Sequence, residues 1–239
     1  MSWLTNLPRS RLSWSGWTAY NDIQSAPSRA MTRPFRCAMA ALFAIQFCSW
    51  SAMFTMWIYA VPLVAANVAH VPLDGSGLQG VLVMVSLGYA TYAVLGTLGS
   101  FALPAMVRRF GHGAVLGAAL LSAASGLALL AGASGWLELL AAFVAIGIGW
   151  SAMGSVPYAV LGKLAPHGRG AHYTRLFGFS TVIPQVVTTL GLALFAPRYL
   201  GSDPHRIVLM GSAVMVLGGV LAIVLRSQFS FADGEHDDW

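Results

Sequence analysis

Charged residues are scarce in this chain, and their scarcity decides the class of protein. Asp, Glu, Lys and Arg together make up 9% of the 239 residues, whereas soluble domains carry about 25%. Hydrophobic residues make up 57% of the chain, and the mean hydropathy is +0.70. So few charged residues cannot provide the hydrated surface that a soluble globular protein needs. The composition therefore predicts an integral membrane protein whose solvent is the lipid bilayer.

Cysteine is also rare, since Cys37 and Cys48 are the only two. They lie on one predicted helix, about 16 Å apart along its axis at ~1.5 Å per residue, which is too far for a disulfide. We expect both to be packing residues. The first 34 residues lack the apolar run of a cleavable signal peptide, so none is predicted.

Catalytic and metal-binding motifs are absent from the sequence as well. It contains no Gly-x-Ser-x-Gly motif, no phosphate-binding loop, no metal-ligand cluster and no Ser/His/Asp set with a plausible site. We therefore predict no enzyme activity, no cofactor and no metal site. The formal charge of +5 comes from basic residues at predicted helix ends, not from one patch, so a nucleic-acid partner is not expected.

What the sequence has in abundance is long apolar segments. Six of them hold about 18 or more largely apolar residues, enough to cross a ~30 Å hydrocarbon core. They are residues 35–66, 78–105, 113–130, 136–163, 171–196 and 206–225. The predicted fold is all-α, a polytopic membrane protein with a bundle over 35–226. A loop is expected at 106–112, and an acidic tail at 227–239.

Residues 1–34 carry arginines and tryptophans among Ser and Pro. They are interpreted either as a disordered cytoplasmic linker or as an interfacial segment lying on anionic lipid. The Trp spacing gives no clean helical face, which favours the linker.

The distribution of basic residues sets the expected orientation. If the N-terminus is cytoplasmic, the six spans put eleven basic residues on the cytoplasmic side and two outside. The eleven are Arg9, Arg11, Arg29, Arg33, Arg36, Arg108, Arg109, Lys163, Arg169, Arg175 and Arg226; the two are Arg198 and Arg206. By the positive-inside rule, both termini are predicted to be cytoplasmic, as in a multi-pass protein of the inner membrane.

The spans also divide into two triplets, 35–130 and 136–226. Because three is odd, the second triplet is inverted relative to the first, an arrangement common in secondary transporters. Two glycine series are expected to let helices approach closely: Gly88, Gly96 and Gly99, then Gly147, Gly149 and Gly154.

Three stretches carry a family resemblance. They are IQFCSWSAMFTMWIY at 45–59, VRRFG at 107–111, and VPYAVLGKLAPHGRG at 156–170 with its continuation VIPQ at 182–185. In this order they resemble helices seven to eleven of the major facilitator superfamily. Within it, they are similar to bacterial sugar transporters of the glycoside–pentoside–hexuronide symporter group. The resemblance covers about residues 30–226, the C-terminal six-helix half of a twelve-helix carrier.

The resemblance implies which side chains line the solute cavity. The candidates are Gln46, Trp50, Trp57, Tyr59, Tyr89, Tyr92, Tyr158 and Gln185. An amide offers a donor and an acceptor, and aromatic faces stack on the C–H face of a pyranose, a combination that suits a neutral polyol. The alternatives are helix packing or interfacial anchoring for the aromatics and an interhelical hydrogen bond for each glutamine. Pro157 and Pro184 are candidate gating hinges or, alternatively, static kinks.

The implied function is sugar:proton symport by alternating access, which one bundle cannot perform alone. The expected partners are the lipid bilayer, a sugar, and a second six-helix bundle supplied by a homodimer or by a separate N-terminal half. Against this, no acidic residue lies deep in a predicted span. Arg175 and Gly178 also replace the family's Gly and Asn. These departures favour the alternative, a non-transporting membrane subunit or a truncated remnant of a carrier.

Overall fold

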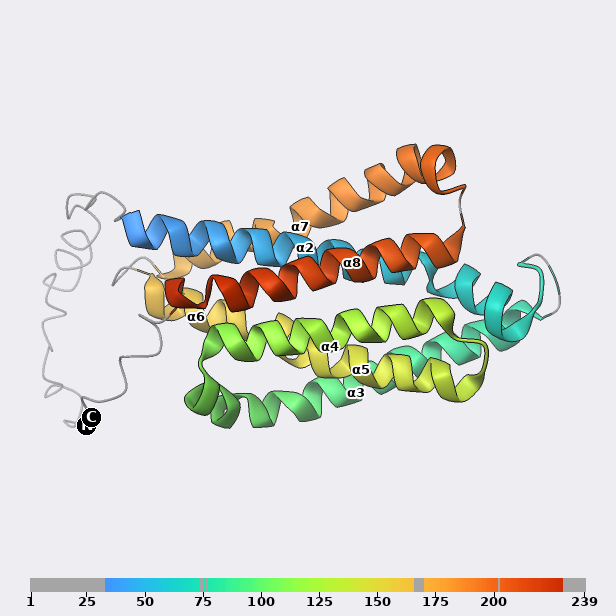
Figure 1. Cartoon of the computed structure of the whole chain (residues 1–239), viewed down its shortest axis with the longest axis horizontal. Coiled ribbons are helices and arrows are strands. Elements are labelled where there is room, and N and C mark those ends of the chain that lie inside the picture. The colour runs from blue at the N-terminus through green and yellow to red at the C-terminus, as the bar shows by residue number, and fades with distance from the viewer. Residues whose placement is uncertain (1–32, 74, 76, 166–169, 202, 230–239) are drawn as a thin grey trace, which may run out of the picture. The chain divides into compact units, whose positions relative to one another are not determined.

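The structure is a computed structural model that describes residues 33–73, 75, 77–165, 170–201 and 203–229. Residues 1–32 of the predicted N-terminal linker, Arg169 and the acidic residues of the tail lie outside these ranges, and the predicted end of the linker at residue 34 is corrected because α2 begins at Arg33. The described part contains helices and no strand (Figure 1). The long helices are α2 (Arg33–Val64), α3 (Leu78–Phe110), α4 (His112–Gly132), α5 (Trp136–Met153), α7 (Gly170–Phe195) and α8 (Pro204–Val224). The short ones are α6 (Val156–Leu164), the π-helical turns Ala65–Ala69 and Ala196–Leu200, and a 3-10 turn at Arg226–Gln228.

The prediction of six membrane-spanning segments is confirmed by length and composition. Six helical stretches are long and apolar enough to cross a bilayer. They are Phe35–Ala69, Leu78–Phe110, His112–Gly132, Trp136–Leu164, Gly170–Leu200 and Pro204–Val224. Because six is even, the described chain begins and ends on the same side of the bundle.

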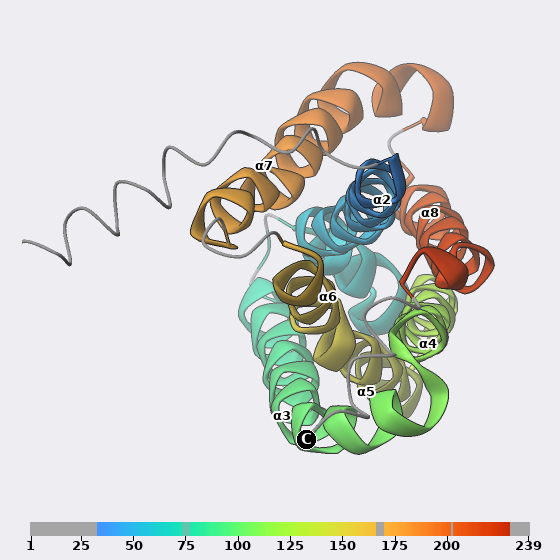
Figure 2. The ribbon, with the colours of Figure 1, turned by 90° about the vertical axis from the view of Figure 1, so that its left-hand side faces the viewer.

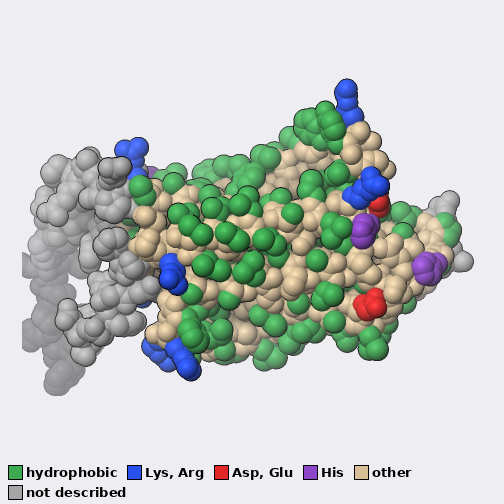
Figure 3. All heavy atoms as spheres, viewed as in Figure 1, with side chains coloured by type: hydrophobic (Ala, Val, Ile, Leu, Met, Phe, Trp, Pro, Cys, Tyr) green, Lys and Arg blue, Asp and Glu red, His purple; other side chains and the backbone are tan. Residues whose placement is uncertain are grey.

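Charged side chains gather at the two ends of the bundle, with an apolar band between them (Figure 3). Both acidic residues of the described ranges, Glu138 and Asp203, belong to the end opposite residue 33. Both lie at helix starts: Glu138, in the first turn of α5, accepts the backbone N–H of Ser134 at 2.6 Å, and Asp203 caps α8 by accepting that of His205 at 3.1 Å. The apolar band is the surface that lipid would cover.

The helices pack in a definite order. Helix α4 lies against α5 and α8, α2 lies against α8 and α7, and α3 lies against α5. Viewed from the end bearing residue 33, α3 and α7 flank one side of the bundle with α6 between them, whereas α4 and α8 lie on the other side (Figure 2). Helices α3 and α7 are the least covered, with 22% of the apolar stretch buried in each.

One residue, Gly111, separates α3 from α4. The predicted loop over 106–112 is therefore corrected: α3 continues to Phe110, and α4 begins at His112. Gly111 has φ = 80°, a conformation that side chains with a Cβ rarely adopt. The sequence pattern missed the extra helix because Arg108 and Arg109 end the apolar run without ending the helix.

The fourth span is interrupted between α5 and α6. Proline has no N–H, and its ring clashes with the carbonyl group four residues earlier. Pro157 therefore disfavours a continuous helix through Met153, where α5 ends. After Gly154 and Ser155, α6 begins at Val156, so Pro157 lies in the first turn of a new helix. Pro184, by contrast, lies within α7, which continues past it to Phe195.

The glycine series of α3 and α5 pack as predicted. A Cβ at Gly88 would collide with the Phe143 ring, and a Cβ at Gly96 would lie 2.5 Å from Cδ1 of Trp150. Gly99, Gly147 and Gly149 also have neighbours that leave no room for a methyl group. Gly154 has no neighbour within 4 Å and belongs to the break after α5.

Replacing Gly126 of α4 with Ala should destabilise the bundle. The new Cβ would lie 2.7 Å from the carbonyl oxygen of Ala142, and backbone cannot move aside as a side chain can. We expect a loss of about 1–3 kcal/mol, measured as a lower midpoint of thermal unfolding in detergent. Gly191→Ala is the control because no atom lies within 4 Å of its Cβ position. Equal effects of the two substitutions would contradict the α4–α5 packing.

Candidate functional site

Three predicted site residues share one face of α2. Gln46, Trp50 and Trp57 lie within about 40° of one another around the helix axis at ~100° per residue. Gln46 is fully buried, whereas the two tryptophans are half-buried. This face of α2 meets aromatic residues from α3 and α5.

The aromatic residues form one connected cluster, which we call the aromatic cluster: Trp50, Trp57, Tyr89, Tyr92, Phe143 and Trp150. Its centre is Trp150 of α5, whose ring centroid lies 5.8 Å from Trp50, 5.9 Å from Trp57 and 5.6 Å from Tyr92. Tyr89 lies 5.8 Å from Tyr92 and 5.7 Å from Phe143. These separations are typical of favourable edge-to-face and tilted ring pairs.

Hydrogen bonds fix part of this cluster. The indole N–H of Trp57 donates to the hydroxyl oxygen of Tyr92 at 3.3 Å. The Tyr89 hydroxyl donates to the carbonyl oxygen of Trp57 at 3.5 Å. Helices α2 and α3 are thereby joined through polar atoms in the apolar interior.

Two buried donors on the same face of α2 have no partner in the described chain. They are the amide Nε2 of Gln46 and the indole Nε1 of Trp50. The Gln46 side-chain oxygen does accept a hydrogen bond, from the Ser49 hydroxyl at 3.4 Å. A buried donor without a partner costs about 1–3 kcal/mol. Such groups are the ones that a hydroxylated solute would satisfy.

The structure brings Trp50, Trp57, Tyr89 and Tyr92 together, with Gln46 one helical turn before Trp50 on the same face of α2, but it does not bring in the remaining candidates. Tyr59 packs where Leu192, Ala196 and Ile207 meet, near the end of α2. Tyr158 is 36% exposed on α6 and lies edge-on to Phe177 of α7, with centroids 5.1 Å apart. Gln185 is exposed on α7. These three residues are not members of the aromatic cluster.

The predicted cytoplasmic basic residues lie on helices. Arg108 and Arg109 form the last turn of α3, where cations favour the negative end of the helix dipole. Arg109 lies over the ring of Phe110, 5.2 Å from its centroid. Arg175 is exposed near the start of α7.

Sequence reasoning missed Trp150 and Phe143, the α5 members of the cluster. A signal was available for Trp150. Tryptophan in membrane spans is enriched at the membrane–water interfaces, so a tryptophan near the middle of an apolar span is unusual and suggests a specific role. Phe143 carries no such signal, since an apolar ring within a span is ordinary packing.

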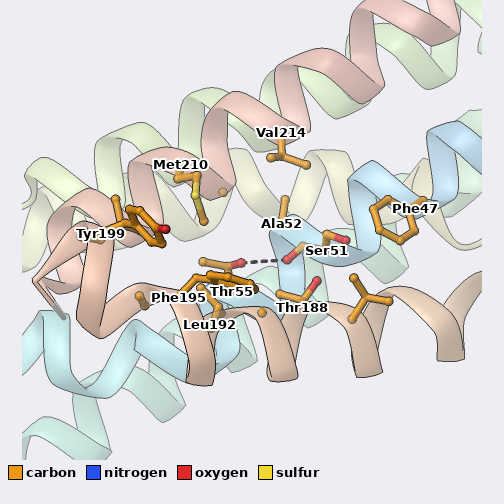
Figure 4. Close-up of a pocket in the computed structure, with 15 residues that line it drawn as sticks. Phe47, Ser51, Ala52, Thr55, Thr188, Leu192, Phe195, Tyr199, Met210 and Val214 are labelled. Atoms are coloured by element: carbon orange, nitrogen blue, oxygen red, sulfur yellow. Dashed lines mark hydrogen bonds between the residues drawn. The ribbon is translucent and has the colours of Figure 1, made fainter.

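Sequence reasoning also missed an apolar cavity of about 380 Å³ between α2, α7 and α8 (Figure 4). Its walls include Phe47, Leu192 and Met210, and its side-chain hydroxyls are those of Ser51, Thr55, Thr188 and Tyr199. The Thr55 hydroxyl donates to the carbonyl oxygen of Ser51 at 2.9 Å. The cavity contains none of the predicted site residues.

Metal chemistry finds no support in the described ranges, where no three His, Cys, Asp or Glu side chains come close enough to hold an ion. No model of a known protein family matches the chain, and a search of curated proteins finds no match. Function is therefore inferred from the geometry of the aromatic cluster and from the resemblance of the motifs.

Replacing Gln46 with Leu should cost the fold little stability. The amide nitrogen has no partner to lose, and Leu removes a buried polar group at similar volume. We expect the unfolding free energy to fall by less than about 1 kcal/mol, measured by thermal unfolding in detergent. Ser212→Ala is the comparison, because its hydroxyl donates across helices to the carbonyl oxygen of Ala124 at 2.8 Å. A larger loss for Gln46→Leu than for Ser212→Ala would contradict the unpaired state of Nε2.

Proposed function

We propose that this bundle is one half of a secondary-active transporter for a neutral, hydroxylated solute of the sugar class. It would work by alternating access after pairing with a second six-helix bundle, as in the superfamily its motifs resemble. The second bundle is another copy of the chain or a separate N-terminal half. The proposed location is the inner membrane, with both termini cytoplasmic.

The aromatic cluster is the observation that carries this proposal. It combines aromatic rings from three helices with the buried, unpartnered N–H of Trp50, and the unpartnered amide of Gln46 lies one turn before Trp50 on the same face of α2. Rings bind the apolar face of a pyranose, and N–H groups bind its hydroxyl oxygens. No charged side chain belongs to the cluster, which favours a neutral solute over an ionic one.

The packing order supports an inverted repeat. The exchange of α2 with α5–α6, α3 with α7, and α4 with α8 maps the extensive helix contacts onto one another and the α4–α8 contact onto itself. The α2–α8 contact becomes α5–α4, and α2–α7 becomes α5–α3. The buried share agrees for two of the three exchanged pairs: it is 56% for the spans containing α2 and α5, and 22% for those containing α3 and α7, whereas it is 61% for α4 and 44% for α8. Internal repeats of this kind are typical of secondary transporters, with the solute site at the repeat interface.

The side flanked by α3 and α7 is the proposed contact with the second bundle. Large apolar side chains remain exposed along both helices; examples are Leu98 and Phe101 of α3 and Leu190 and Leu194 of α7. The aromatic cluster includes side chains of α3 and of its neighbours α2 and α5. A second bundle on this side would enclose a solute there.

The charge asymmetry of the two ends supports the proposed orientation. In the described ranges, the end bearing residue 33 has basic side chains and no acidic one, whereas the opposite end carries both Glu138 and Asp203 (Figure 3). The more basic end is expected to face the cytoplasm.

Proton coupling requires an ionisable group inside the membrane. In the described ranges, the two carboxylates lie at helix starts at one end of the bundle, so the coupling group of the proposed symporter would come from the second bundle. The same observation favours the rival function, a membrane subunit that moves no solute. Solute binding decides between them.

A neutral sugar should change the tryptophan fluorescence of the purified chain, reconstituted with any bundle that co-purifies. A panel of neutral mono- and disaccharides is titrated, and we expect a saturable change for at least one. Gln46→Leu and Trp50→Phe should each weaken binding about tenfold, the equivalent of one hydrogen bond of about 1.4 kcal/mol.

The matched controls are Gln79→Leu and Trp136→Phe, which change the same residue types at exposed positions outside the cluster. Binding should be unchanged in both. Uptake of the bound sugar into proteoliposomes under a proton gradient then tests transport. Absence of any sugar response, or binding without uptake by the paired bundles, would favour the non-transporting subunit.

Cysteine cross-linking tests the proposed contact surface. In a chain with Cys37 and Cys48 replaced by Ala, Leu98→Cys and Leu190→Cys should cross-link in native membranes to a second bundle. The product is read by mass, which separates a homodimer from a different partner. Leu217→Cys is the control, since Leu217 is exposed on α8, on the other side of the bundle. Equally efficient cross-linking at Leu217 would overturn the assignment of the α3 and α7 faces.

A further inference from the structure

A second cavity, of about 650 Å³, lies at the basic end of the bundle, between the end of α3, the start of α4 and α6. We call it the basic pocket. It is lined by Ser100, Leu103, Pro104, Val107, Arg108, Gly111, His112, Ser155, Val156, Ala159 and Lys163. Its volume falls within the range of pockets that hold small ligands. It shares no residue with the aromatic cluster.

Two helix faces converge on this pocket. On α6, Ser155, Ala159 and Lys163 recur every four residues and so lie on one face. Ser100, Pro104 and Arg108 do the same on α3. The small side chains of Ser100, Ser155 and Ala159 leave the space, and Gly111 turns the chain directly into α4. The pocket is therefore formed by the packing of three elements.

The chemistry of the lining is graded along the helix axes. Leu103, Pro104 and Val107 provide an apolar part nearer the middle of the bundle. Arg108 and Lys163 provide cations toward the end, and His112, 4% exposed, is buried in the lining. Both acidic residues of the described ranges lie at the other end of the bundle. An occupant with an anionic group and an apolar continuation fits this gradient.

The geometry points to a binding site for the phosphate headgroup of an anionic phospholipid. Arg108 and Lys163 would bind the phosphate oxygens, and Leu103, Pro104 and Val107 would contact the glycerol end of the lipid. Phosphates of bilayer lipids lie at the depth where spanning helices end, and basic pockets between such helices bind anionic headgroups. Arg is suited to phosphate because its planar fork donates two parallel hydrogen bonds. This inference does not depend on the proposed transport function.

Native mass spectrometry of the purified full chain tests the site. The protein is titrated with dioctanoyl phosphatidylglycerol, with dioctanoyl phosphatidylcholine and with inorganic phosphate. We expect phosphatidylglycerol to bind most tightly. Combining Arg108→Gln with Lys163→Gln should weaken its binding about 30-fold, since each basic residue near an anionic headgroup contributes a factor of about five.

The matched control combines Arg109→Gln with Arg226→Gln, which removes the same charge from the same end outside the pocket lining. It should leave binding within about twofold, which corresponds to less than 1 kcal/mol. An equal loss in both double variants would mean general electrostatic attraction and would overturn the site. Phosphatidylcholine binding as tightly as phosphatidylglycerol would overturn it too. So would inorganic phosphate binding with no advantage for the lipid, because the ligand would then be soluble.

A variant that keeps both cations distinguishes the contribution of the cavity to binding from that of the two basic side chains. Ala159→Phe fills the cavity from an exposed position on α6 while Arg108 and Lys163 remain. We expect phosphatidylglycerol binding to be lost with the unfolding midpoint unchanged in lipid-free detergent. Retained binding would show that the cavity is not the site.

Discussion

The close approach of α4 to α5 and α8 is the contact on which the rest of the bundle depends. Lipid provides no hydrophobic drive between helices, so association relies on backbones coming near enough for dense packing. A Cβ at Gly126 would lie 2.7 Å from a carbonyl oxygen of α5, and one at Gly117 would lie 2.9 Å from the carbonyl oxygen of Gly219 in α8. Helix α4 thus holds α5 and α8 at once, and α8 in turn supports α2. Through this chain of contacts, the two halves of the bundle become one unit.

The aromatic cluster depends on the same kind of packing. Gly88 and Gly96 of α3 admit the rings of Phe143 and Trp150, so both α5 members are held against the backbone of a neighbouring helix. Rings that are already immobilised by close packing lose little side-chain freedom when a solute stacks on them. The entropic cost of binding therefore stays low. The positions of the two α5 rings therefore follow from the positions of glycines on α3.

Sequence reasoning predicted the spans well because hydropathy over twenty residues is a strong signal, and it placed the close contacts of Gly88, Gly96 and Gly147. It did not predict where helices end. Arg108 and Arg109 ended the apolar run, but backbone hydrogen bonding carried α3 on to Phe110. Within the cluster, Trp50 and Trp57 were recognised by motif, as was Gln46 on the same face of α2. Trp150 was not, because its role arises from contacts with two other helices. Tyr59, Tyr158 and Gln185 carry the right chemistry, yet the fold directs them elsewhere.

Helix length has a consequence for the membrane this bundle fits. Helices α4 and α8 have 21 residues each, or about 32 Å at ~1.5 Å per residue, close to the ~30 Å of an average hydrocarbon layer. Helix α3 has 33 residues, about 50 Å on the same scale, and must tilt or extend into the headgroup layers. In a thicker bilayer, the hydrocarbon layer would exceed the length of α4 and α8, whereas α3 would still span it. Hydrophobic mismatch would then act first on the pair of helices that holds the bundle together, so bilayer thickness is itself a determinant of its stability.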